Sequence, residues 1–196
     1  EAMPSSPRAV NRRKSDWNFF VAEQRGLLFA IALFIAMFAL YLSKHPAGFS
    51  ARVVNTAANT GTLLALAAMA QTIPVLTGGL DLSVGMVMVL ANCLASTLMN
   101  GSPLQTAAGV LAVLVVGLLC GAINGSIVVY GRLQPIIATL ATGAIYYGVA
   151  LWLRPAPGGT VNTDFADVVV GSLPGGIPVA LVLLLGIVLF IWLPYR

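Results

Sequence analysis

The chain has 196 residues, of which 59% are hydrophobic and 8% charged, and its mean hydropathy is +0.94. A soluble domain carries about a quarter of charged residues, because its surface faces water. This composition excludes an ordinary soluble domain and predicts a protein whose solvent is lipid. The net charge is +4, and five of the ten Lys and Arg residues precede the first apolar run. Because these charges stand beside an apolar segment, control of membrane topology is a simpler interpretation than nucleic-acid binding.

Residues 1–25 are polar and contain five of the ten Lys and Arg side chains. We predict that they form a cytoplasmic tail and that residues 26–196 form one transmembrane region. The first apolar run could instead be a signal peptide, since basic residues precede it. Its length, the lack of a clean small-residue cleavage site and the further apolar segments favour a retained anchor.

Six apolar segments follow the tail. They are Gly26–Leu42, Val53–Leu76, Leu82–Met99, Leu104–Tyr130, Ile136–Leu153 and Ile177–Leu193. A membrane-spanning helix needs about 20 predominantly apolar residues, with about 17 as the lower limit. The sequence therefore predicts an all-α, polytopic membrane helix bundle with about six transmembrane helices.

The basic residues predict that the N-terminus lies in the cytoplasm. With the N-terminus inside, seven basic residues fall on the cytoplasmic side and three on the outer side, which is the expected bias. The seven are Arg8, Arg12, Arg13, Lys14, Arg25, Arg132 and Arg196, and the three are Lys44, Arg52 and Arg154. The long loop 154–176 then lies outside, where Asp164–Val170 could form one amphipathic helical turn on the membrane surface.

Several polar side chains interrupt the apolar segments at similar depth. The candidates for a solute pathway in the cytoplasmic third of the membrane are Gln71, Asp81, Ser83, Asn124, Thr139 and Thr142, and Asn92 stands alone near the middle of its segment. These groups suit a polar route for a hydroxylated solute. The alternative is hydrogen bonding between helices, worth about 1 kcal/mol per contact. That alternative is favoured for each single Ser or Thr and for Asn92, whereas for Gln71 and Asn124 the two interpretations stand about equal.

Two features of the turn and one of the fourth segment predict local structure. The Asp81 carboxylate suits an N-terminal cap on the amide of Ser83 or Val84, and Gly78 and Gly79 before it suit a turn with positive φ angles. Gly117, Gly121 and Gly125 are spaced four apart, which predicts close packing against another helix. Gly121→Leu should therefore disturb assembly more than Gly109→Leu. Cys93 and Cys120 are expected to pack between helices as small hydrophobic residues.

The sequence carries no motif for catalysis, nucleotide binding or metal binding. It contains a single histidine and no H-E-x-x-H, G-x-S-x-G or Walker sequence. We therefore predict no catalytic residue and no metal site in this chain.

Three segments resemble a known family. They are GGLDLSVG at 78–85, GAINGSIVVYGRLQPIIATLAT at 121–142 and GSLPGGIPVALVLLL at 171–185. Their order and spacing are similar to those of the permease subunits of bacterial ABC-type importers for ribose, xylose, arabinose, galactose and related sugars. The resemblance covers roughly residues 50–196.

This resemblance implies a transmembrane subunit of an ATP-driven monosaccharide importer in the bacterial inner membrane. It implies three partners: a second permease subunit, a cytoplasmic ATP-binding subunit and a periplasmic sugar-binding protein. ATP would be the cofactor of the ATP-binding partner, and this chain would need none. Family members continue beyond a segment like Leu193–Arg196, so the chain is expected to be an N-terminal portion. The alternative function is a secondary transporter or channel for a small polar solute, without an ATPase partner.

Overall fold

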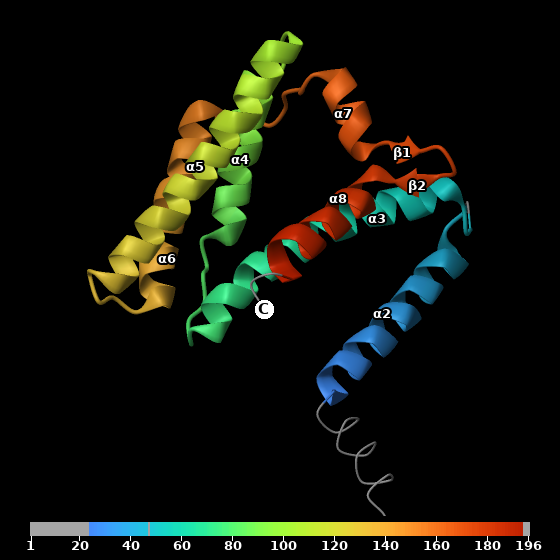
Figure 1. The fold of residues 1–196 in the computed structure, drawn as a ribbon, viewed down its shortest axis with the longest axis horizontal. Coiled ribbons are helices and arrows are strands. Elements are labelled where there is room, and N and C mark those ends of the chain that lie inside the picture. The colour runs from blue at the N-terminus through green and yellow to red at the C-terminus, as the bar shows by residue number, and fades with distance from the viewer. Residues whose placement is uncertain (1–23, 47, 194–196) are drawn as a thin grey trace, which may run out of the picture. The chain divides into compact units, whose positions relative to one another are not determined.

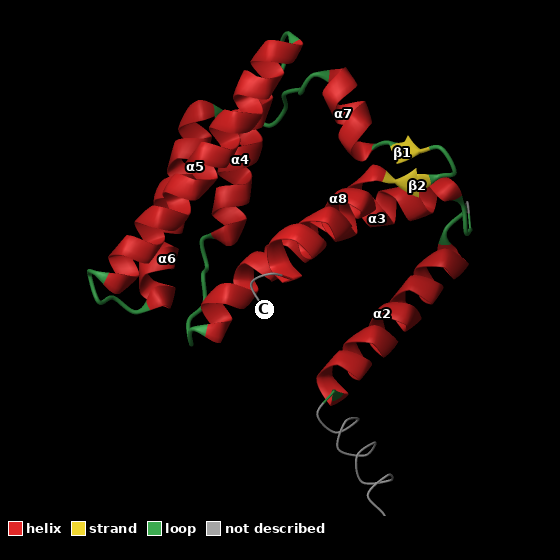
Figure 2. Cartoon of the chain, in the orientation of Figure 1, coloured by secondary structure: helices red, strands yellow, loops and turns green. Residues whose placement is uncertain are grey.

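The computed structural model describes residues 24–46 and 48–193, and these are almost entirely helical (Figure 1). The helices are α2 (Arg25–Lys44), α3 (Ala51–Leu76), α4 (Val84–Leu98), α5 (Pro103–Val129), α6 (Pro135–Leu153), α7 (Thr163–Val170) and α8 (Val179–Ile187), which continues as the π-helix η1 (Val188–Trp192). Two short strands, β1 (Ser172–Leu173) and β2 (Ile177–Pro178), lie between α7 and α8 (Figure 2). The chain divides into two compact units, residues 1–50 and 51–196. The tail predicted for residues 1–25 lies almost entirely outside the described residues.

Each of the six predicted apolar segments forms a helix over most of its length, which confirms the predicted all-α membrane fold. Within residues 24–46 and 48–193, four helices are long and apolar enough to cross a membrane, and they are α2, α3, α5 and α6. The other two apolar helices, Val84–Leu98 and Val179–Ile191, are shorter. Helices are the expected structure, because a segment in lipid must pair its backbone groups within itself. The chain is a multi-pass membrane protein.

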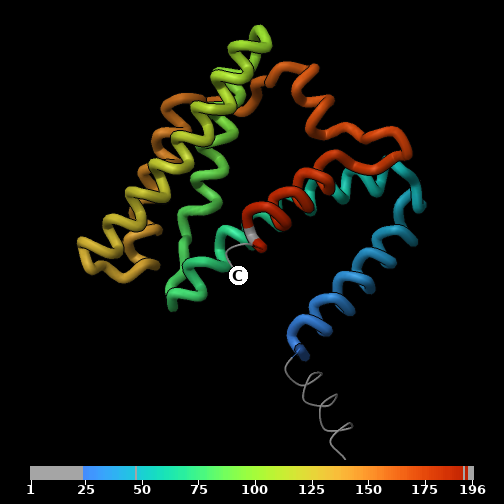
Figure 3. The backbone as a smooth tube through the Cα atoms, in the orientation of Figure 1, coloured from blue at the N-terminus to red at the C-terminus, as the bar shows by residue number. Residues whose placement is uncertain are grey.

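Helices α4, α5 and α6 pack against one another and form a three-helix bundle (Figure 3). Its core contains Leu90 from α4, Cys120 from α5, and Tyr146 and Ala150 from α6, all of them buried. Cys93 packs against this cluster, so both cysteines behave as the small hydrophobic residues that the sequence predicted. Proline opens α5 and α6, where its missing N–H costs nothing because the first helical amides have no intrahelical partner.

Helix α3 packs along α8, and the segment between α7 and α8 holds this pair together (Figures 1 and 3). Strands β1 and β2 form an antiparallel hairpin in which Ser172 pairs with Pro178 and Leu173 with Ile177. The turn between the strands places Gly175 at φ +98° and Gly176 at φ +78°, a backbone conformation that favours glycine. The sequence predicted a loop up to residue 176 and a membrane helix from Ile177, so it predicted neither strand, and α8 begins at Val179 instead. A hairpin this short depends on contacts with neighbouring elements, so it cannot be predicted from its local sequence.

Helix α7 confirms the amphipathic turn predicted for Asp164–Val170. The Asn162 side chain begins it, because its Oδ1 accepts a hydrogen bond from the Phe165 amide at 3.1 Å. The same side chain donates from Nδ2 to the Gly101 carbonyl at 2.9 Å, and the Asn162 amide donates to the Met99 carbonyl at 2.6 Å. The start of α7 is therefore fixed to the turn that joins α4 to α5.

Candidate solute pathway

Helix α3 ends in a turn that leads the chain to the polar residues before α4. The Gly79 amide donates to the Pro74 carbonyl at 2.8 Å and the Gly78 amide donates to the Val75 carbonyl at 3.0 Å, which is the hydrogen-bond pattern of a Schellman C-cap. Gly78 lies at φ +79° and so confirms the predicted positive φ. The same prediction for Gly79 is wrong. Glycine is required there because a Cβ would lie 2.9 Å from Cγ of Pro135, at the start of α6.

Gln71 holds the backbone of Asp81. With its amide oriented to satisfy both contacts, the Gln71 side chain donates to the Asp81 carbonyl at 3.0 Å and accepts from the Asp81 amide at 3.1 Å. The Gln71 side chain thus exchanges two hydrogen bonds with the Asp81 backbone, as two paired residues do in an antiparallel sheet. Gln71 therefore fixes the segment between α3 and α4, and its polar atoms are occupied by protein.

The Asp81 side chain organises the start of α4. Its Oδ1 accepts from the Ser83 amide at 2.8 Å and from the Ser83 hydroxyl at 2.6 Å. The predicted bond to the Ser83 amide is confirmed, but the N-cap of α4 is Ser83 and not Asp81, because the helix begins only at Val84. Both bonds go to one carboxylate oxygen, and no partner within the described residues is recorded for the other.

A chain of hydrogen bonds connects Asp81 with α5 and α6. The Asn124 amide donates from Nδ2 to the Ser83 hydroxyl at 2.7 Å. The Tyr146 hydroxyl lies 3.1 Å from Oδ1 of Asn124 and 3.1 Å from the Cys120 carbonyl, two acceptors between which its single proton is shared. Ser83, Asn124 and Tyr146 are all buried, with 1%, 5% and 7% of their surface exposed, so this network is enclosed in the bundle.

The two candidate threonines of α6 hold backbone groups. Thr139 accepts from the Leu82 amide at 2.9 Å and donates to the Pro135 carbonyl of its own helix at 2.9 Å. Thr142 donates to the Ala138 carbonyl at 3.1 Å, one helical turn back. The structural interpretation of these threonines therefore agrees with their contacts.

A hollow of about 410 Å³ lies beside this network, between α3, α4 and α5. Its walls are mostly apolar, and Asp81, Ser83 and Asn124 supply polar groups to it. The lining also includes Leu63, Leu66, Ala67, Ala70, Val84, Val87, Met88, Gly117 and Gly121. A mainly apolar cavity with a few fixed polar groups is the usual form of a small-molecule site, for which volumes of roughly 300–1,000 Å³ are typical.

The predicted close packing of the glycine face is not found among the described residues. No atom of another element lies within 4 Å of a Cβ built on Gly117, Gly121 or Gly125, and the first two of these glycines border the hollow instead. The closely packed glycine of α5 is Gly109, where a Cβ would overlap Cγ of Met99. Within this chain, Gly109 is therefore the more closely packed of the two glycines, and the predicted effect of Gly121→Leu on assembly stays a prediction.

Five of the seven candidate polar residues are brought together by the structure. Thr142 instead bonds to backbone carbonyls of its own helix. Gln71, Asp81, Ser83, Asn124 and Thr139 all meet around the start of α4, as their common predicted depth implied. Asn92 is exposed on α4 and lies outside this group.

Tyr146 belongs to the network and was missed from the sequence. The available signal was its position, because it follows Thr139 and Thr142 on one face of a helix and its hydroxyl needs a partner within an apolar segment.

The relatives of the chain are components of import systems. The autoinducer 2 import system permease protein LsrD of Photorhabdus laumondii is 28% identical over 184 residues, which cover 88% of this chain and 54% of that protein. The proteins of the same name from Escherichia coli K12 and Shigella flexneri are each 31% identical over 141 residues, which cover 66% of this chain and 42% of the relative. The chain thus spans about half the length of these curated relatives. No solved structure matches the chain.

A family model matches residues 53–196, which include the hollow and the whole hydrogen-bond network. Its description is a branched-chain amino acid transport system, permease component. The match confirms the resemblance to importer permeases that the three sequence segments carried. Because it extends over most of the chain, this protein belongs to the family of branched-chain amino acid transport system permease components.

Proposed function

We propose that this chain forms part of the translocation pathway in the permease of an ATP-driven monosaccharide importer. The observation that carries the proposal is the hollow beside Asp81, which combines apolar walls with polar groups from α4 and α5. Its volume of about 410 Å³ leaves room for a small solute. The family and the names of the relatives, which are import system permeases, support the transport class.

Asp81 is the residue best placed to contact a solute in this hollow. One of its carboxylate oxygens is occupied by the two bonds from Ser83, and its side chain also borders the cavity. A carboxylate oxygen accepts hydrogen bonds strongly, and sugar hydroxyls are donors. We assign Asp81 as the acceptor for a solute hydroxyl, while Gln71, Ser83 and Asn124 hold it in position.

The proposal includes the assembly that such an importer requires. A second permease subunit would complete the pathway, a periplasmic sugar-binding protein would deliver the solute, and a cytoplasmic ATP-binding subunit would hydrolyse ATP. ATP is thus a cofactor of the partner, and the whole assembly would lie in the bacterial inner membrane. A secondary transporter or channel could use the same hollow, but membership in a permease-component family favours the ATP-driven system.

Asp81→Asn tests the proposal. Asparagine keeps one side-chain oxygen that can accept both bonds from Ser83, but it replaces the second oxygen with an amide donor. In the complete importer we expect sugar uptake to fall by about tenfold, because hydrogen bonds to charged groups contribute about 1.5–3 kcal/mol. Uptake of radiolabelled D-ribose, D-xylose, L-arabinose and D-galactose into right-side-out vesicles, with and without ATP enclosed on the cytoplasmic side, provides the measurement.

Asp164→Asn in α7 is the matched control, because Asp164 does not border this hollow. It should leave uptake unchanged, and both variants should reach the membrane at the level of the unmodified protein. Normal uptake by Asp81→Asn would contradict the role of Asp81. Uptake that does not require ATP would favour the secondary transporter.

A further inference from the structure

A second group of polar side chains lies on α3, away from Asp81. Asn55, Asn59 and Thr62 are spaced four and three residues apart and therefore share one face of the helix. The side-chain oxygens of all three are buried and have no hydrogen-bond partner among the described residues. Thr62 has 7% of its surface exposed. Buried polar atoms are nearly always paired in folded proteins, so three unpaired oxygens on one helix face require an explanation.

The orientation of Asn59 is fixed by a neighbouring element. Its Nδ2 donates to the carbonyl of Val170, the last residue of α7, at 2.9 Å. This bond occupies the donor side of the amide and leaves Oδ1 as an acceptor. The missing partner of Asn59 is therefore a hydrogen-bond donor.

Two of these three residues border a hollow of about 360 Å³ between α3 and α8. Asn59 and Thr62 both line it, together with apolar residues of α8 and the end of α7. No Asp, Glu, Lys, Arg or His is among the residues that line this hollow. An ionic ligand would have no charged partner in this hollow, so its occupant is expected to be neutral.

The two hollows are neighbours along α3. Leu63 and Leu66 border both the hollow beside Asp81 and the one beside Thr62. In the predicted orientation α3 runs inward, which places Thr62 nearer the outer surface and the Asp81 site nearer the cytoplasm. The side chains of Leu63 and Leu66 are therefore shared walls of the two hollows.

We propose that the hollow between α3 and α8 is an outer binding site for a neutral, hydroxyl-bearing solute of monosaccharide size. A solute hydroxyl donates to Oδ1 of Asn59, and another exchanges a hydrogen bond with the Thr62 hydroxyl, which can both donate and accept. Asn55, one turn away, offers a further acceptor to a solute or to a water that accompanies it. The assignment rests on the proposed function for the identity of the solute, since the transported sugar would occupy this site before it reaches Asp81.

Thr62→Val tests this site, because valine has the shape of threonine without the hydroxyl. The variant is made in the complete permease, purified in lipid nanodiscs, and titrated with D-ribose, D-xylose, L-arabinose and D-galactose by saturation-transfer NMR. The dissociation constant of the sugar that binds should rise about fivefold, as expected for one lost hydrogen bond. Thermal stability should stay the same or rise, because an unpaired buried polar group has been removed. Thr62→Ser keeps the hydroxyl and should restore binding.

Thr106→Val in α5 is the matched control. Thr106 is also buried, its hydroxyl is also unpaired among the described residues, and it borders a different hollow. This variant should leave sugar binding unchanged.

Three results would overturn the site: no sugar of the panel binds, Thr62→Val binds as tightly as the unmodified protein, or Thr62→Val lowers thermal stability without changing binding. The last result would mean that the hydroxyl bonds to another protein helix, such as one from a second copy. Failure of the proposed function is a separate observation, because it would appear as an absence of ATP-dependent uptake while sugar binding at Thr62 persists.

Discussion

Asn124 shows how one side chain can satisfy polar groups on two other helices. Its amide nitrogen donates to Ser83 of α4, and its amide oxygen lies within hydrogen-bond distance of Tyr146 of α6. Inside a membrane an unpaired polar group is costly, so this arrangement joins three helices at a defined depth. The interpretation of Asn124 as a helix-joining residue therefore agrees best with its contacts, while its place beside the hollow lets it also position Asp81 through Ser83.

Tyr146→Phe measures the strength of this connection. The substitution removes only the hydroxyl, so Oδ1 of Asn124 loses this donor, while the Cys120 carbonyl keeps the backbone bond of its own helix. We expect a loss of about 1 kcal/mol in the free energy of unfolding, the usual contribution of one such bond. Thermal unfolding of the purified protein in detergent, followed by intrinsic fluorescence, gives the comparison.

Tyr147→Phe is the adjacent control. Tyr147 is exposed on α6, so removing its hydroxyl should leave the unfolding temperature unchanged. Equal unfolding temperatures for the two variants would mean that the Tyr146 hydroxyl contributes nothing to the bundle.

Helix α5 has two kinds of glycine, and the difference depends on what lies opposite each one. Gly109 is buried against the end of α4, where a Cβ would overlap Met99 and lie 3.4 Å from the Leu98 carbonyl carbon. Gly121 is exposed toward the hollow and has free space around its Cβ position. The first glycine allows α4 and α5 to approach, and the second leaves room inside the cavity.

Gly109→Ala should therefore destabilise the protein, whereas Gly121→Ala should not. The methyl group at residue 109 forces a shift of α4 or Met99, and such overpacking costs typically about 1–3 kcal/mol. The methyl group at residue 121 meets open space, and alanine favours helix over glycine by about 1 kcal/mol. Thermal unfolding of both variants distinguishes them. A lower unfolding temperature for Gly121→Ala than for Gly109→Ala would contradict this expectation. It would support the close packing of the glycine face that the sequence predicted.

The helices could be predicted from the sequence, because in lipid each apolar segment must form its own backbone hydrogen bonds. The gathering of Gln71, Asp81 and Asn124 also followed from their depth alone, since residues at one depth of neighbouring helices lie in one layer. Which element packs against each helix face could not be predicted in this way. Spacing shows that Gly121 permits a close helix, but only the tertiary fold shows whether a helix is there. The Asn59–Val170 bond likewise joins residues 111 positions apart, beyond any local pattern.

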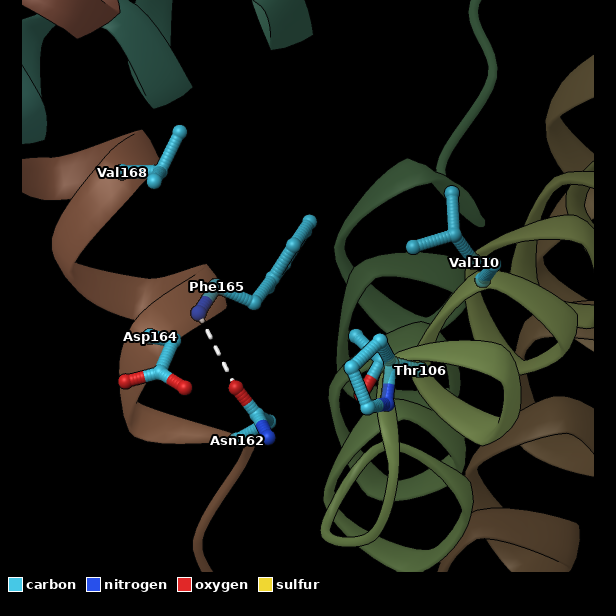
Figure 4. A pocket seen from close by; sticks show the side chains of 8 residues that line it. Thr106, Val110, Asn162, Asp164, Phe165 and Val168 are labelled. Carbon is cyan, nitrogen blue, oxygen red and sulfur yellow. Dashed lines mark hydrogen bonds between the residues drawn. The ribbon is translucent and has the colours of Figure 1, made fainter.

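At the scale of the whole molecule, the bundle has a polar end and its orientation in the membrane decides which side that end faces. The hydrogen-bond network around Asp81 lies where α3 ends, α4 begins and α6 begins. It therefore lies toward one side of the membrane. The opposite end carries α7 and the β1–β2 hairpin, which are joined to the α4–α5 turn by Asn162. Figure 4 shows α7 there, with Asn162 bonded to the Phe165 amide and Phe165 directed toward Thr106 and Val110 of α5 across a hollow of about 540 Å³.

The basic residues predict that the polar network lies near the cytoplasm and that α7 lies outside. Helix α6 separates the two test positions. Gln134 precedes its first residue, Thr160 follows its end, and both are exposed. Its 19 residues span about 28 Å, close to the roughly 30 Å of a bilayer's hydrocarbon core.

After Cys93 and Cys120 are replaced by alanine, a cysteine at Thr160 should react with an impermeant thiol reagent added to intact cells. A cysteine at Gln134 should react only after the cells are permeabilised, because the membrane shields it. The reverse pattern would place the start of α6 and the Asp81 network outside. The orientation predicted from the basic residues would then be wrong.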